Sequence, residues 1–295
     1  MDNNEKAIVR TLLYSDVFDY PLSEDEVWKF LISDKNINKR LFESKVKKIN
    51  SIVFRKEGLL YIEKKELAVS KRIEKFTHSQ KKINIAYKTI KKLFIIPSVL
   101  FVGISGNLSM MNAEKKDDID LFVVSKKDTV WITRLLLIIY LKILGKHRKR
   151  TDRNVSDKIC LNMIVDEENL SLPKNLRNLY TAHEVAQLRP VMQRGNIYQK
   201  FINSNEWIKK YMPNVIRESE SQGIEESRKS LPKVLSELIL RFTFLENLAK
   251  LFQRMLIKRN LTREIIEDKI IALHPKDYKS IILAQYRERI AKYGL

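Results

Sequence analysis

The amino-acid sequence predicts a mixed α/β (α+β) protein, in which a small mixed sheet is flanked by helical regions. Short β-branched runs, such as Val99–Ile104 and Leu121–Val124, indicate buried strands. Longer stretches with apolar residues three and four positions apart, such as residues 66–95, indicate amphipathic helices. With 295 residues, of which 44% are hydrophobic, the chain is long enough to bury a substantial core.

Residues 1–65 have the pattern of three helices and a β-hairpin. Ser23 and Glu26 form a capping box at the start of the second helix. Gly58 marks the turn between two short strands. The first and third helices are expected at residues 5–14 and 39–50, and the strands at 52–55 and 59–63. This order resembles winged-helix domains, which defines residues 1–65 as an expected N-terminal domain.

In winged-helix domains the third helix enters the major groove of DNA. The resemblance therefore implies DNA contacts by basic residues of that helix and of the wing. These residues are Lys39, Arg40, Lys45, Lys47, Lys48 and Lys56. The region carries little net charge, however, which suits a protein-interaction module equally well.

Residues 66–95 are expected to form a linking helix with one apolar stripe and one basic face. The formal net charge of the chain is +20, and the excess is concentrated in residues 66–100 and 171–295. A basic surface attracts nucleic acids, nucleotides and other anions. The expected macromolecular partner is therefore a nucleic acid, tRNA or DNA, bound through the basic helices. A merely solvated basic face is the alternative.

The cellular compartment can be predicted from the cysteine content and from the longest apolar run of the sequence. Cys160 is the single cysteine, so no disulfide framework forms within the chain, and a reducing cytoplasm is expected. The start of the sequence lacks the pattern of a signal peptide. The run from 130 to 144 is interrupted by Arg134 and Lys142 and is shorter than the ~20 residues of a membrane span. It is expected to be a buried helix, and no membrane partner is expected.

The segment 99–125 contains the strongest chemical pattern in the chain. A strand ends at a glycine turn containing Gly106, and a second strand begins at Asp118 and Asp120. Alternate residues of a strand share one face, ~6.5–7 Å apart, so these two carboxylates point the same way while Ile119 enters the core. Two carboxylates facing a glycine turn suit a hard divalent cation carrying a phosphate chain. A solvated turn is the alternative reading of acidic residues at a strand start.

The sequences Ser105-Gly106-Asn107 and Asp118-Ile119-Asp120, at this spacing, resemble the signature of the DNA polymerase beta-like nucleotidyltransferase superfamily. The resemblance covers residues 99 to 165. It implies transfer of a nucleoside monophosphate from a nucleoside triphosphate (NTP), with Mg²⁺ or Mn²⁺ held by the two aspartates. It also implies that Ser105, Gly106, Asn107 and Asn162 bind the nucleotide.

Four positions depart from the superfamily pattern or supplement it. The residue after the glycine is Asn107 instead of serine, and the strand 158–165, which should supply a third carboxylate, carries Asn162 at its centre. Asp157 could replace that carboxylate only in a different register. Glu184, on a helix that Thr181 is expected to cap, is the candidate general base, as in antibiotic-modifying members of the superfamily.

The expected layout is completed by a nucleotidyltransferase core over residues 96–190 and a helical region over 191–295, with a linker at 214–230 and helices at 234–257, 262–273 and 277–293. These helices are expected to complete the substrate cleft or to form a homo-oligomer. Two functions remain open. One is a metal-dependent nucleotidyltransferase acting on RNA, protein or a small molecule. The other is a nucleotide-binding regulator or adaptor that does not turn its ligand over.

Overall fold

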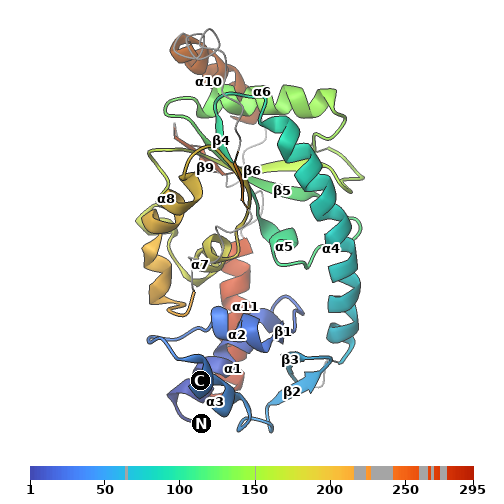
Figure 1. Ribbon diagram of the computed structural model, residues 1–295, viewed down its shortest axis with the longest axis vertical. Coiled ribbons are helices and arrows are strands. Elements are labelled where there is room, and N and C mark those ends of the chain that lie inside the picture. Colours follow the sequence, from blue (N-terminus) through green and yellow to red (C-terminus); the bar gives the residue numbers. More distant parts are fainter. Residues whose placement is uncertain are drawn as a thin grey trace.

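The computed structural model describes residues 1–63, 66–149, 151–215, 224–226, 242–258, 265–266, 269–272 and 278–295. The mixed α/β class is confirmed, since helices surround a central mixed sheet (Figure 1). A second, smaller sheet lies among the N-terminal helices. No helix in the described part of the chain has the length and apolarity needed to cross a bilayer.

The N-terminal elements follow the expected order, with one added short strand. They are α1 (Asn3–Asp16), β1 (Leu22–Ser23), α2 (Glu24–Lys29), α3 (Lys39–Val46), β2 (Val53–Lys56) and β3 (Leu59–Ile62). The three strands form an antiparallel sheet in the order β1-β3-β2. The capping box of Ser23 and Glu26 is present at the start of α2. The assignment of these elements to the winged-helix class stays a prediction.

Helix α4 (Glu66–Leu93) connects the N-terminal elements to the central sheet along one side of the molecule (Figure 1). Arg72 on this helix is buried between the two parts. Its guanidinium donates to the Met110 carbonyl at 2.9 Å and to the Glu26 carboxylate at 2.8 Å. These two hydrogen bonds tie α2 to the segment that follows the glycine turn.

The central sheet has the strand order β8-β7-β4-β5-β6-β10-β9 within the described residues. The bounds are β4 (Val99–Ile104), β5 (Ile119–Ser125), β6 (Ile159–Asp166), β7 (Arg189–Gln193), β8 (Glu225–Glu226), β9 (Ile265–Ile266) and β10 (Ile270–Ala272). Strands β5 and β6 are parallel, whereas β4 is antiparallel to both β5 and β7. The two strands predicted around the glycine turn are therefore direct neighbours.

Helices cover both faces of this sheet, and alternation along β5 decides which side chains meet them. One face packs against α4, α6 (Val130–Ile143) and α10 (Phe242–Lys258) and includes Ile119, Leu121 and Val123. The opposite face packs against α7 (Leu179–Ala186) and α8 (Ile197–Ser204) and includes Phe122 and Val124. Asp120 alternates with Ile119 and Leu121, so it lies on the α7 side.

The C-terminal third differs from the expected helical region. The boundary expected at 190 falls inside β7, and β9 and β10 lie where a helix over 262–273 was predicted. Strand β7 contains Pro190 and lacks apolar alternation, so only its backbone pairing with β4 marks it as a strand. Most of the linker predicted at 214–230, and the first part of the helix predicted at 234–257, lie outside the described residues.

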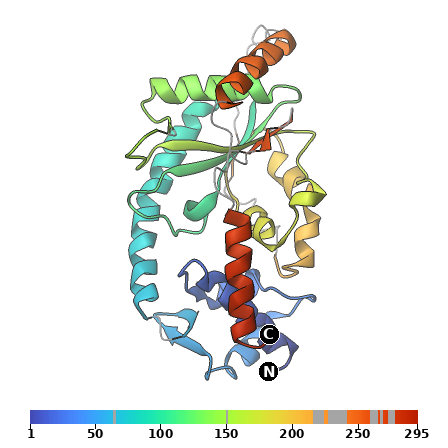
Figure 2. The same cartoon turned by 180° about the vertical axis from the view of Figure 1, so that it is seen from behind.

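Helix α11 (Tyr278–Lys292) runs from the central sheet to the N-terminal elements (Figure 2). Tyr286 makes an edge-to-face contact with Tyr14 of α1, with ring centroids 5.4 Å apart. Arg289 pairs with Asp16 at the end of α1, at 2.7 Å. Opposite ends of the sequence therefore pack against each other.

Candidate functional site

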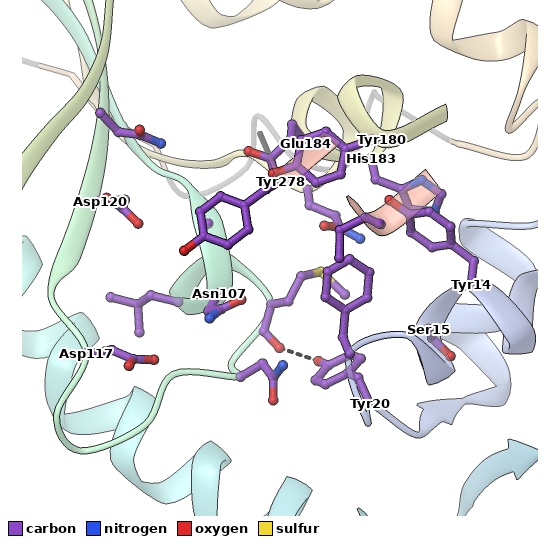
Figure 3. Close-up of a pocket in the computed structure, with 18 of the residues that line it drawn as sticks. Tyr14, Ser15, Tyr20, Asn107, Asp117, Asp120, Tyr180, His183, Glu184 and Tyr278 are labelled. Atoms are coloured by element: carbon purple, nitrogen blue, oxygen red, sulfur yellow. Dashed lines mark hydrogen bonds between the residues drawn. The ribbon is translucent and has the colours of Figure 1, made fainter. Parts of the chain in front are cut away.

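A cavity of about 480 Å³ lies where the central sheet, the N-terminal elements and helices α7 and α11 meet (Figure 3). Its polar lining includes Gly106, Asn107, Asn112, Asp117, Asp118, Asp120, Arg148, Cys160, Asn162 and Glu184. Its aromatic lining is Tyr14, Phe18, Tyr20, Phe30, Tyr180 and Tyr278. Cofactor and small-molecule sites commonly have volumes of ~300–1,000 Å³. The cavity is therefore large enough for a ligand of nucleotide size.

The two predicted aspartates lie together on the sheet side of this cavity. Ile119 is fully buried between them, on the opposite face, as the alternation of an extended chain requires. Burial, and next the neighbouring Asp118 carboxylate, raise the pKa of Asp120 to about 7. Burial also raises the pKa of Asp118, although the Arg148 guanidinium opposes that shift. The pair thus places two partly buried carboxylates side by side, and a bound cation would relieve their mutual repulsion.

The glycine turn approaches the aspartate pair closely. Gly106 begins the short helix α5 (Gly106–Ser109) with a φ of +63°, and a Cβ atom there would lie 2.8 Å from Asp120 Oδ2. The Ser105 backbone N–H donates to the Asp120 carbonyl at 3.0 Å, which fixes this approach. Only glycine combines the left-handed conformation with the space that the carboxylate needs.

The three other predicted nucleotide-binding residues surround the turn. Asn107 and Asn162 line the cavity, and the Asn162 amide lies 3.3 Å from the Ser105 hydroxyl, to which it donates. Ser105 itself is buried behind the turn. Asn112, next to this group, is 7% exposed, and its Oδ1 is buried without a hydrogen-bond partner in the described part of the chain. An unsatisfied buried amide oxygen that lines a cavity indicates a place for a ligand donor.

Cys160 and Arg148 complete the acidic end and were not predicted as site residues. Cys160 lies opposite Asp120 in the parallel pairing of β5 and β6, and one ligand atom each from Asp118, Asp120 and Cys160 lie within 4.8 Å of one another. Arg148 Nε lies 3.1 Å from Asp118 Oδ2, and Nη1 lies 3.4 Å from Cys160 Sγ. Strand periodicity could have identified Cys160, because it lies two residues before Asn162 and thus on the same face.

Glu184 reaches the same cavity from α7, as its proposed role requires. The helix is capped by Asn178 instead of Thr181, which occupies the third helical position and completes a capping box with Asn178. Asn178 has the extended backbone of an N-cap residue, and its side chain accepts from the Thr181 backbone N–H. Burial raises the pKa of Glu184 to about 7, while a hydrogen bond with Tyr180 opposes the shift. Glu184 is therefore poised to exchange a proton near neutral pH.

Asp157, the reserve candidate for a third carboxylate, points elsewhere. Its carboxylate accepts from the buried Lys82 ammonium at 2.8 Å, and Lys82 also donates to the Asp117 carbonyl. The Lys82 ammonium and the Asp157 carboxylate therefore neutralise each other beside the site. Asp157 is not among the described residues that line the cavity. The residue of β6 that meets both aspartates is therefore Cys160.

The aromatic wall of the cavity comes largely from outside the predicted core. Tyr14 of α1 stacks on His183 of α7, with ring centroids 4.0 Å apart, and Tyr20 donates to the Met110 carbonyl (Figure 3). Tyr278 projects into the cavity from the start of α11 (Figure 3). The N-terminal elements are thus a wall of this site, which the sequence did not predict, and α11 lines it as well, in keeping with one of the two roles expected of the C-terminal helices.

The raised pKa values predict an unusual pH dependence of stability for the metal-free protein. Asp120 and Glu184 keep their protons in the fold up to a pH of about 7, whereas the unfolded chain loses them near pH 4. Their contribution to stability is therefore present below about pH 4 and is lost as the pH rises to about 7. Burial lowers the pKa of His183 to about 4, and this acts in the opposite direction.

The comparison that isolates the carboxylate is between the wild type and Asp120→Asn. Chemical unfolding in EDTA is expected to show the variant gaining stability relative to the wild type as the pH rises from about 4 to about 7. His183 contributes equally to both proteins and cancels. A constant difference across this range would contradict a buried, protonated Asp120.

No family model, curated protein or solved structure matches the chain. The chemistry of the cavity is therefore the observation that bears on function. Its donor set, two carboxylates and a thiol on one wall, fits a divalent ion by the chemistry of the ligands.

Proposed function

We propose that the protein is a metal-dependent nucleotidyltransferase, which moves a nucleoside monophosphate from an NTP to an acceptor hydroxyl or phosphate. The observation that carries this proposal is the contact between the Gly106 turn and the Asp120 carboxylate at the wall of a nucleotide-sized cavity. A bare backbone turn directly against paired carboxylates can hold a phosphate chain and its counter-cation together.

In this reaction the chain's own residues would position the triphosphate and neutralise its negative charge. Asp118 and Asp120 would hold divalent ions, which supply charge neutralisation for the triphosphate and for the leaving pyrophosphate. Asn107, beside the Gly106 turn, offers an amide donor to the terminal phosphates. Arg148 supplies a further positive charge on the same wall, and it can move from Asp118 to a phosphate oxygen once a metal replaces it.

Glu184 is the proposed general base. It takes the proton of the acceptor hydroxyl as the oxygen attacks the α-phosphorus, and the bond to pyrophosphate breaks. The Tyr180 hydroxyl, hydrogen-bonded to Glu184, orients the carboxylate. The pKa of about 7 allows this group to accept and then release a proton near neutral pH.

The acceptor class is open among RNA, protein and small molecules. The positive charge of the chain favours an anionic acceptor such as RNA, because basic surfaces raise the local concentration of polyanions. The aromatic wall made by Tyr14, Tyr180 and Tyr278 offers flat surfaces for a base or another planar group.

A second candidate function is nucleotide binding without turnover. One observation favours it: β6, the strand from which the superfamily resemblance implies a third carboxylate, lines the cavity with Cys160 and Asn162, neither of which is an acid. A protein with one full charge fewer at the metals would hold NTP but stabilise the transition state less. The N-terminal elements would then report nucleotide occupancy to a partner.

One assay separates the two candidates. The full chain is incubated with each NTP and Mg²⁺ or Mn²⁺, and pyrophosphate release and calorimetric binding are measured on the same samples. The expected result is binding together with release, both abolished by EDTA. Binding without release across RNA, protein and small-molecule acceptors supports the regulator instead. The absence of both binding and release contradicts both candidates.

A further inference from the structure

The ligand that β6 contributes to the acidic cluster is a thiol. The Cys160 sulfur and a carboxylate oxygen of each of Asp118 and Asp120 lie within 4.8 Å of one another. Asn162, two residues further along the strand, is instead held by its hydrogen bond to Ser105. Three potential metal ligands therefore converge, and one of them is soft.

A positive charge already lies against this cluster. The Arg148 guanidinium contacts both Asp118 and Cys160. Arg148 Nε and Asp118 Oδ2 are nevertheless buried without a properly directed hydrogen bond in the described part of the chain. Asn112 Oδ1, in the same cavity, is likewise buried and unpartnered. The guanidinium balances charge here but leaves ligand atoms unsatisfied, as expected of a site built for another cation.

We propose that this site binds a divalent transition-metal ion, with Asp118, Asp120 and the Cys160 thiolate as ligands, in preference to Mg²⁺. Magnesium takes oxygen ligands, whereas thiolate ligands select softer ions. The thiol loses its proton to solvent when the ion binds. This inference rests on the proposed function, since it refines which metal the aspartate pair holds, but its test does not depend on turnover.

Co²⁺ titration of the full chain provides the test, because a thiolate bonded to Co²⁺ gives a charge-transfer absorption. Cys160 is the chain's single cysteine, so any such band belongs to this site. The wild type is expected to show the band, and Cys160→Ser is expected to lose it and to bind Co²⁺ at least about tenfold more weakly. Arg148→Gln removes the competing charge and is expected to bind Co²⁺ roughly tenfold more tightly.

Cys160→Asp provides the converse variant, since it restores an all-oxygen site. It is expected to lose the charge-transfer band and to gain Mg²⁺ affinity relative to Co²⁺, with thermal melts confirming that each variant is folded. Absence of the band in the folded wild type overturns the inference, even if NTP turnover with Mg²⁺ is observed. A band in the wild type without pyrophosphate release under any ion supports the metal site and contradicts the proposed enzyme.

Discussion

Asp120→Asn is expected to lower metal-dependent pyrophosphate release by at least about a thousandfold while making the metal-free protein more stable at neutral pH. The loss follows because metal ligation supplies several kcal/mol of charge stabilisation, and each ~1.4 kcal/mol is a factor of ten in rate. The gain follows because the raised pKa of Asp120 reflects burial beside Asp118, and the amide removes that unfavourable charge.

Steady-state pyrophosphate release and thermal melts in EDTA measure the two effects. Asp25→Asn is the matched control, since Asp25 is largely exposed and pairs with Lys39 on the surface. It is expected to change neither quantity appreciably. A folded Asp120→Asn protein that retains most of its turnover would remove Asp120 from the reaction. A variant that loses both activity and stability would assign the residue a structural role instead.

Gly106→Ala is expected to abolish nucleotide and metal binding in a protein that still folds. The added methyl group would lie 2.8 Å from Asp120 Oδ2, so either the turn or the carboxylate must move. The φ of +63° adds the left-handed strain of about 1–2 kcal/mol that any alanine meets there. Displacement of either partner separates the phosphate contact from the metal ligand.

Gly145→Ala is a close control for the backbone contribution. Gly145 has a φ of +64°, but a Cβ atom there would meet nothing within 4 Å. Gly145→Ala should therefore lose only the stability that the left-handed conformation costs, and Gly106→Ala should lose that amount plus the cost of its clash with Asp120. Only Gly106→Ala should lose calorimetric binding of NTP with divalent metal. Equal binding by the two variants would show that the turn does not touch the ligand.

Local periodicity in the sequence predicted the elements that carry the aspartates. Strand alternation is fixed by the backbone, so Asp118 and Asp120 were expected to share a face once the run Leu121–Val124 and the residues leading into it were recognised as a strand; in the structure this strand is Ile119–Ser125. The helix at 130–143 followed in the same way from its apolar pattern. These features depend on neighbours in sequence, and they needed no knowledge of tertiary contacts.

Other parts of the site depend on which segments meet in space. The register that places Cys160 beside Asp120 is set by the pairing of two strands separated by a helix and a long loop. Sequence reasoning considered Asn162 as the central polar residue and did not fix that register. Tyr14 was read as part of an N-terminal helix, and only the docking of α1 against α7 makes it part of the cavity.

The basic loop after α6 is a second case in which the sequence alone could not predict a contact, here an electrostatic one. Its positive residues, among them Lys146, Arg148 and Lys149, indicate an attraction to anions without naming one. The structure places Arg148 on Asp118 and Cys160, because the loop returns to the edge of β6 through the backbone pairing of Arg148 with Ile159. The run of positive charge predicts that the loop binds an anion, but it could not predict that Arg148 contacts Asp118.

The packing of α11 against α1 has a consequence for how the protein matures. Helix α1 supplies Tyr14, and α11, which is synthesised much later, supplies Tyr278, yet both residues line the same cavity. A nascent chain that has been synthesised as far as α7 already contains the acidic residues of the cavity. It still lacks the cavity wall that α11 supplies. The cavity would therefore acquire its complete lining only after α11 emerges and docks, so a ligand that needs every wall could bind only late in synthesis.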